Sequence, residues 1–243
     1  MRGSAKNRTM KHSSTDCTNA KALWNLKEAA DAPYRHTAEI HRSAQVIVSA
    51  LDMNTIPLDL VLDTPRCTLR AVSEEDVPFV WSATRFAGFN DGLRWNPPRE
   101  PQELVQACRT NLEAWRAGRA FTFTIVLKAT QHPVGRIAIR AEPRDGVWSI
   151  GFWIHPEMWG QGFAAEAAQA VIEFGFSRLR VSVVQAAHAT WNVQSKRVIE
   201  KLGMRFIREN PCGFKKNGKA MPELEYALTK DERSSPSLHP TAG

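Results

Sequence analysis

The residues with the clearest chemical use lie between Ile150 and Glu166, in the stretch IGFWIHPEMWGQGFAAE. Gly160 and Gly162 stand directly before an alanine-rich segment, and glycine lets the backbone pass close to a ligand. The first N–H groups of a helix have no partner inside the helix and lie at its positive end. If a helix begins near Phe163, this turn therefore forms a binding site for an anion such as a phosphate.

This glycine turn is weak evidence when taken alone, because a tight turn before a helix needs no ligand. Its spacing differs from the dinucleotide-binding pattern G-x-G-x-x-G, and it lacks the Gly-Lys-Ser/Thr end of a P-loop, so nucleotide hydrolysis loses its main support. A second loop-to-helix start, NVQSKRVIEKLG at 192–203, follows the next expected strand. Two such starts therefore flank neighbouring strands.

The elements that position these turns follow from hydrophobic periodicity. A strand at 66–72 leads into Ser73-Glu-Glu-Asp76, a capping-box pattern that starts a helix through about Arg85, and a second helix at 101–117 stops at Gly118. The pattern then predicts strands at 121–128, 133–141 and 147–154, a helix at 163–178, a strand at 181–187, a helix at 193–202, and strands at 204–208 and 223–228. This order predicts a mixed α/β domain whose three central strands form an antiparallel meander.

Both ends of the chain differ in composition from its middle. Residues 1–20 and 230–243 are polar, and we expect both to be disordered. Asn19–Asp31 and His36–Asp52 have helix-compatible apolar spacing interrupted by Pro33. The expected organisation is an N-terminal extension over 1–60, partly disordered or weakly helical, one domain over 61–229 and a disordered tail over 230–243.

Composition limits the class of protein. The chain has 243 residues, of which 43% are hydrophobic and 23% charged, which is close to the globular average and excludes fibrous proteins. It has no apolar run of about 18 residues, and its polar start lacks the apolar centre of a secretion signal, so we expect a cytoplasmic protein without a membrane partner. A net charge of +7 favours anionic partners. The four cysteines have no paired spacing, so no metal is expected.

The two turns together resemble the GCN5-related N-acetyltransferases (GNAT). Four sequence motifs resemble the RimJ/RimL-like branch of this family, which acetylates the N-termini of ribosomal proteins. They start at Gly151 (GFWIHP), Trp159 (WGQGFAAEA), Asn192 (N-x-x-S) and Glu200 (EKLGM). The resemblance extends from about Asp63 to Leu228. It implies a mixed, mostly antiparallel sheet of six to seven strands, splayed at its centre and flanked by about four helices.

The resemblance also implies acetyl-coenzyme A (acetyl-CoA) as the donor, with direct attack of an amine on the thioester and no acetyl-enzyme. The pyrophosphate turn of the family, Gln/Arg-x-x-Gly-x-Gly/Ala, falls on Trp159, Gly162 and Ala164. Because Trp159 departs from this consensus, we expect backbone amides to hold the phosphates. The implied cofactor-binding residues are Trp153, Ile154, Trp159, Gly160, Gln161, Gly162, Phe163, Ala164 and Asn192.

Two strands carry the implied chemistry. The strand that ends at Phe152–Ile154 is implied to splay from the strand at Val181–Ala187, so that pantetheine inserts between them and a backbone N–H polarises the thioester carbonyl. Asn192 is implied to bind the pantetheine arm. Asparagine is also a favoured helix N-cap, and the two roles can coexist.

Three residues are candidates for proton transfer. Ser195 stands near the position where many relatives place a tyrosine that protonates the leaving thiolate, and a local role at the helix start is the alternative. Ser149 stands where relatives often carry a carboxylate. His188 has a suitable unperturbed pKa of ~6.5 and faces the cleft if its strand ends there, with a satisfied surface histidine as the alternative.

The acceptor is the least defined partner. Weak base candidates favour an α-amine of pKa ~8, which is about a tenth neutral at pH 7, over a lysine of pKa ~10.4. Trp95 and Asn96 lie in the Phe86–Pro98 loop, where the family builds its acceptor lid, and are candidate substrate-binding residues. The alternatives are an acetyltransferase for a small amine such as an antibiotic or polyamine, and a non-catalytic acyl-CoA-binding module. No specific nucleic acid is expected, and the assembly is a monomer or a homodimer.

Overall fold

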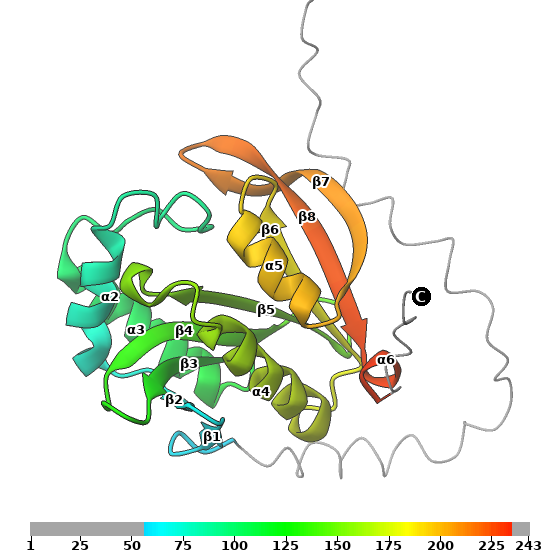
Figure 1. Cartoon of the computed structure of the whole chain (residues 1–243), viewed down its shortest axis with the longest axis horizontal. Helices are drawn as coiled ribbons and strands as arrows, with labels where there is room; N and C mark the ends of the chain where they lie inside the picture. Colours follow the sequence, from blue (N-terminus) through cyan, green and yellow to red (C-terminus); the bar gives the residue numbers. More distant parts are fainter. Residues whose placement is uncertain (1–55, 235–243) are drawn as a thin grey trace, which may run out of the picture. The chain divides into compact units, whose positions relative to one another are not determined.

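The computed structural model describes residues 56–234, which form one sheet with helices on both faces (Figure 1). The strands are β1 (Val61–Asp63), β2 (Cys67–Ala71), β3 (Ala120–Leu127), β4 (Pro133–Ala141), β5 (Val147–Ile154), β6 (Val183–Ala189), β7 (Arg205–Lys216) and β8 (Lys219–Thr229). The helices are α2 (Val77–Thr84), α3 (Pro101–Arg116), α4 (Phe163–Arg178), α5 (Val193–Lys201) and α6 (Lys230–Ser234), with the 3-10 turns η1 (Glu74–Asp76) and η2 (Pro156–Met158).

The sheet has the strand order β1-β2-β3-β4-β5-β6-β8-β7. Only β5 and β6 pair in parallel, so the expected mixed and mostly antiparallel sheet is confirmed. The described residues contain eight strands instead of six to seven, because the three residues of β1 pair with β2 but are too few to show a period in the sequence. Helix α6 likewise adds a fifth helix where about four were expected.

The C-terminal part of the sheet differs from the prediction. We expected separate strands at 204–208 and 223–228, but β7 and β8 form one long hairpin. Its turn uses Asn217 at φ +49° and Gly218 at φ +75°, the positive angles that an Asn-Gly hairpin turn requires. Residues 230–234, assigned to a disordered tail, form α6 because Thr229 and Glu232 exchange the hydrogen bonds of a capping box.

The main core lies between the sheet and α4. Phe174 of α4 contacts the rings of Phe121 and Phe123 on β3, and Ala168 and Val171 of the same helix are fully buried. Thr124, which alternates with Phe123, binds Asp76 on the opposite face of the sheet. Helices α4 and α5 therefore cover one face, while η1, α2 and α3 cover the other (Figure 1).

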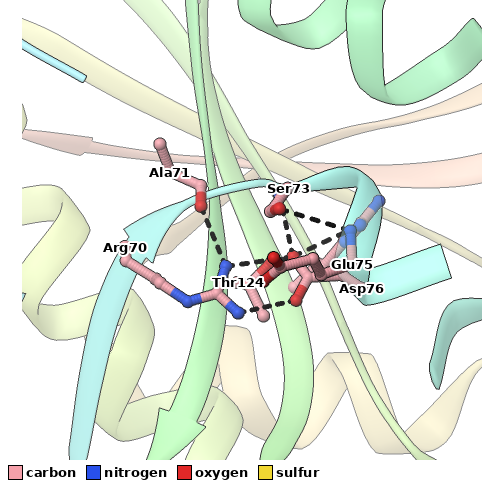
Figure 2. A network of polar contacts seen from close by, with 7 residues as sticks. Arg70, Ala71, Ser73, Glu75, Asp76 and Thr124 are labelled. Carbon is pink, nitrogen blue, oxygen red and sulfur yellow. Dashed lines mark hydrogen bonds and ion pairs between the residues drawn. The ribbon is translucent and has the colours of Figure 1, made fainter. Parts of the chain in front are cut away.

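A polar network joins η1 to strands β2 and β3 (Figure 2). The carboxylate of Asp76 accepts hydrogen bonds from two nitrogens of Arg70 at 2.7 and 3.1 Å, and from the Thr124 hydroxyl at 2.6 Å. Ser73 completes the predicted capping box by accepting from the Glu75 amide and donating its own amide to Asp76. Burial alone raises the pKa of Asp76, but these hydrogen bonds outweigh burial and the pKa lies below its ordinary value.

Residues 56–234 contain no helix that is both long and apolar enough to cross a membrane. No group of three or more His, Cys, Asp or Glu side chains gathers there as a metal site. The helical patterns at 19–31 and 36–52 lie outside the described residues.

Candidate active site

Strands β5 and β6 diverge halfway along their length. Their pairing ends at Ile150 and Ala186, whereas β5 continues to Ile154 and β6 to Ala189. The expected central splay is therefore present in the sheet.

The backbone of β5 supplies polar groups to this splay. The His155 amide donates to the Val134 carbonyl on β4 at 2.9 Å, so the alternate residues of β5 turn their amides towards β4. Phe152 and Ile154 consequently turn their backbone groups towards the side from which β6 has separated. The backbone groups of Trp153 have the opposite orientation and pair with Arg136 on β4.

A cavity of about 410 Å³ occupies the splay. It is bounded by β5, by the turn before α4, by α5 and by the loop between α2 and α3. Among the predicted residues, those that line it are Trp153, Ile154, Trp159, Gly160, Gly162, Phe163, Ala164, Asn192 and Ser195. Among residues 56–234, the ionisable residues that line it are Arg197 and Lys201 alone, and both are cations.

The glycine turn has the conformation that the sequence predicts. Gly160 and Gly162 adopt φ angles of +77° and +83°, which side chains with a Cβ rarely adopt, and α4 begins directly afterwards at Phe163. The first hydrogen bond of α4 runs from the Glu166 amide to the Gly162 carbonyl. Within the described chain, the amides of Phe163, Ala164 and Ala165 therefore lack an acceptor, as expected at a helix start.

Arg66, in the bend between β1 and β2, and Glu166, in the first turn of α4, brace this glycine turn. Arg66 donates to Glu166 through Nε at 2.7 Å and through its backbone amide at 2.8 Å, while its Nη1 donates to the Gln161 carbonyl at 2.9 Å. Its guanidinium also lies 4.4 Å from the Phe163 ring centre. Sequence reasoning missed this contact because the two charged residues are 100 positions apart. Gln161 lines a neighbouring hollow beside Arg66 and not the main cavity.

Asn192 and Ser195 meet at the start of α5. The Asn192 Oδ1 atom accepts the Ser195 amide at 3.0 Å, which confirms the N-cap role. The Asn192 Nδ2 atom and the Ser195 hydroxyl have no hydrogen-bond partner among residues 56–234, and both residues line the cavity. The capping role of Asn192 thus leaves its amide donor available.

Comparison with known proteins identifies the family of the chain. Residues 66–205 match the family model described as an acetyltransferase (GNAT) domain, which is more than half of the chain. The chain belongs to the GNAT acetyltransferase family. It is an acyltransferase enzyme, and the two sequence relatives described below carry the name N-acetyltransferase.

This acetyltransferase is similar in sequence to some known proteins and in fold to others. It is 26% identical over 149 residues to the uncharacterized N-acetyltransferase p20 of Bacillus licheniformis, covering 59% of this chain and 82% of that protein. It is 31% identical over 120 residues to the uncharacterized N-acetyltransferase YnaD of Bacillus subtilis (strain 168), covering 48% and 69%.

Two solved structures show the same fold at low sequence identity. The ribosomal L7/L12 alpha-N-protein acetyltransferase RimL in complex with coenzyme A has a TM-score of 0.64 at 20% identity, covering 71% of this chain and 99% of that one. RimJ of Mycobacterium smegmatis in complex with CoA-disulfide has a TM-score of 0.63 at 21% identity, covering 73% and 90%.

The structure places His188 away from the cleft, so the expectation that it faces the cleft is wrong. Strand periodicity puts His188 on the core face beside Ala186, and it is 4% exposed. Its Nδ1 atom lies 2.8 Å from the Ala189 carbonyl oxygen, and its ring stacks on Tyr226. Ser149 is half-buried between Arg140 and Gln185 in the strand register, on the opposite face of the sheet, and does not line the cavity either.

The loop between α2 and α3 covers one side of the acetyltransferase cavity, to which it contributes Phe89, Gly92 and Leu93. Trp95 and Asn96, the predicted acceptor residues, do not line the cavity; Trp95 packs on Phe89 and Asn96 is exposed. The loop is held by an ion pair of 2.6 Å between Arg94 and Glu223. Lys216 at the tip of β7 also donates to the carbonyls of residues 90, 91 and 93.

Several lining residues were missed by sequence reasoning. Gln194, Arg197, Val198 and Lys201 all lie on α5, at i, i+3, i+4 and i+7 spacings that place them on one helical face. This periodicity was a usable signal. The loop residues Gly92 and Leu93 gave no such signal, because a loop has no period.

Proposed function

We propose that this acetyltransferase takes its acetyl group from acetyl-CoA and transfers it to the α-amine of a protein N-terminus. The observation that carries the proposal is the character of the cavity. Its lining is largely apolar, its two ionisable groups are the cations Arg197 and Lys201, and it ends at the unpaired amides of α4. An apolar channel that ends in cations and amides suits a long neutral arm attached to phosphates.

The position of each residue in the cavity gives it a separate role in binding or catalysis. Acetyl-CoA would supply the acetyl group as a thioester. The backbone amides of Phe152 or Ile154 would donate to the thioester carbonyl, because strand β6 leaves them without a partner. Asn192 would donate its Nδ2 hydrogens to the pantetheine arm, and Ser195 would donate to the departing sulfur. The amides of residues 160–165 would hold the pyrophosphate.

The choice of an α-amine rests on the absence of a general base at the cavity. In the described part of the chain, no carboxylate and no histidine lines it. An α-amine of pKa ~8 is about a tenth neutral at pH 7, so it can attack the thioester directly, whereas a lysine amine of pKa ~10.4 is almost wholly charged. The similarity in fold to RimL, an alpha-N-protein acetyltransferase, supports the same choice.

A thiol-release assay with acetyl-CoA tests the acceptor. The panel contains peptides with a free N-terminus, the same peptides with a blocked N-terminus and an internal lysine, and small amines such as polyamines and aminoglycosides. We expect turnover with free N-termini, and mass spectrometry should locate the acetyl group on the α-nitrogen. Acetylation of lysine side chains or small amines alone would contradict the choice of acceptor.

Calorimetric titration of coenzyme A into the folded protein tests the donor separately. We expect one binding event per chain. A folded protein that shows no binding by calorimetry or by ligand-detected NMR would overturn acetyl-CoA as the donor.

A further inference from the structure

Arg140 lies beside the point where β5 and β6 separate, on the face opposite α4. In the β4–β5 register it pairs with Ser149, and its Nη1 atom is 3.3 Å from the position that a Cβ atom on Gly151 would occupy. Gly151 is the first residue of β5 beyond the last pair with β6. Because Gly151 has no side chain, the guanidinium reaches across β5 towards the splay.

Arg140 also differs from the other arginines on this face. Arg94 pairs with Glu223 at 2.6 Å, Arg208 pairs with Glu225 at 2.8 Å, and Arg70 pairs with Asp76. Arg140 forms neither a hydrogen bond nor an ion pair with any residue in the described range 56–234; its electrostatic neighbours are Arg94 and Glu142.

The carboxylates around the splay are already paired with other arginines, so Arg140 lacks an anionic partner. By strand register, Glu225 and Glu223 lie across from Ala187 and Ala189 on the same face, but their carboxylates are engaged by Arg208 and Arg94. Arg140 is an exposed side chain, and partial desolvation of its guanidinium, followed by the positive charge of Arg94, lowers its pKa below the ordinary value. An anion that arrives with a ligand can therefore reach the guanidinium and stabilise its charge.

The cofactor phosphates are poor candidates for that anion. The unpaired amides of α4 and the cations Arg197 and Lys201 belong to helices on the other face of the sheet. The face that carries Arg140 is the one approached by the α2–α3 loop, where the acceptor is expected.

We propose that Arg140 binds a carboxylate of the acceptor, so that the preferred acceptor is a protein N-terminus with an acidic side chain close to its α-amine. This inference rests on the proposed function. A guanidinium can donate two parallel hydrogen bonds to one carboxylate, and this geometry selects a carboxylate over its amide isostere. Arg140 would thus determine specificity without taking part in the chemistry.

The test compares peptides that are identical except for Asp, Asn or Lys, placed in turn at each of the first three positions. With the wild-type enzyme we expect kcat/KM for the best Asp peptide to exceed that of its Asn partner by about tenfold. In Arg140→Gln this ratio should fall to about one while KM for acetyl-CoA is unchanged. Arg140→Glu should favour the Lys peptide. The matched control Arg116→Gln, an exposed arginine at the end of α3, should retain the wild-type preference.

The outcomes separate this inference from the proposed function. Equal kcat/KM for Asp, Asn and Lys peptides with the wild-type enzyme overturns the role of Arg140 but leaves N-terminal acetylation intact. Free amino acids that outperform every peptide, with the same dependence on Arg140, support the carboxylate contact and overturn the peptide as its source. If no amine is acetylated, the proposed function fails, and calorimetric binding of Asp and Asn peptides to the CoA-loaded protein still decides whether Arg140 prefers a carboxylate. Coenzyme A binding verifies that each variant is folded.

Discussion

The indole nitrogen of Trp159 donates a hydrogen bond of 2.7 Å to the carbonyl oxygen of Ile154. This contact ties the glycine turn to the end of β5, on the side where β6 has left the strand unpaired. The family consensus places a glutamine or arginine at this position of the turn. In this protein the tryptophan braces the backbone of the turn, and Arg66 supplies a cation from the bend before β2, next to Gly162.

Replacing the indole with a phenyl ring tests this brace. We expect Trp159→Phe to weaken coenzyme A binding about threefold to tenfold, since a net hydrogen bond contributes about 0.5–1.5 kcal/mol. Isothermal titration calorimetry measures the change. Trp81→Phe is the control, because Trp81 lies on α2 and packs on Arg85 outside the cavity, so it should bind coenzyme A as the wild type does. Equal affinities for both variants would contradict the bracing role.

The left-handed glycine of the turn allows a second test with a matched control. Gly162 and Gly218 have φ angles of +83° and +75°, so alanine at either position should lower the free energy of unfolding by about 1–2 kcal/mol. Urea denaturation should show similar losses for both variants. Only Gly162→Ala should also weaken coenzyme A binding, because Gly218 lies in the β7–β8 hairpin turn. Unchanged affinity in Gly162→Ala would separate the turn from the ligand.

Asn192 has two roles that substitutions can separate. Serine is as good an N-cap as asparagine but lacks the amide donor, so Asn192→Ser should keep the wild-type stability and raise KM for acetyl-CoA several-fold. Asn192→Ala should raise KM equally and also lose about 1 kcal/mol of stability. Thermal unfolding and steady-state kinetics measure the two effects. If KM is unchanged in Asn192→Ser, the side chain is a cap alone.

Lys216 should control the mobility of the α2–α3 loop. Its ammonium donates to three carbonyls of that loop, so Lys216→Met should speed hydrogen exchange at residues 90–93 and raise KM for the acceptor about threefold to tenfold. Hydrogen exchange followed by mass spectrometry reports the first effect. The neighbouring Lys215 is exposed, and Lys215→Met should change neither quantity. Unaltered exchange in Lys216→Met would show that the loop is held by other contacts.

The lowered pKa of Asp76 predicts a dependence of stability on pH. A carboxylate whose pKa is lower in the folded than in the unfolded state stabilises the fold above the unfolded value of about 3.9, and this contribution is lost as pH falls through the folded pKa. Asp76→Asn should cost about 3–5 kcal/mol at pH 7, because it leaves Arg70 and Arg136 without their anion.

Urea denaturation between pH 3 and pH 7 measures both effects. The stability of Asp76→Asn should fall less steeply in acid than that of the wild type. Asp145→Asn, at an exposed position, should follow the wild-type curve. A parallel acid loss in Asp76→Asn would assign the pH dependence to other carboxylates.

Local patterns predicted much of the fold correctly. The capping box at Ser73–Asp76, the start of α4 at Phe163 and the N-cap at Asn192 were all predicted, because each depends on hydrogen bonds within one turn of chain. The capping box of Thr229 and Glu232 has the same signature and was overlooked. Long-range contacts such as Arg66 with Glu166 gave no local signal.

The sequence by itself determined the elements and the glycine turn, since periodicity and capping are encoded by residues a few positions apart. Only the tertiary structure decided which side chains reach the splay. It buried His188 against Tyr226 and brought Arg140 across Gly151, because strand register and strand order set which residues of distant segments share a face. Register depends on the packing of the whole sheet, and no local pattern records it.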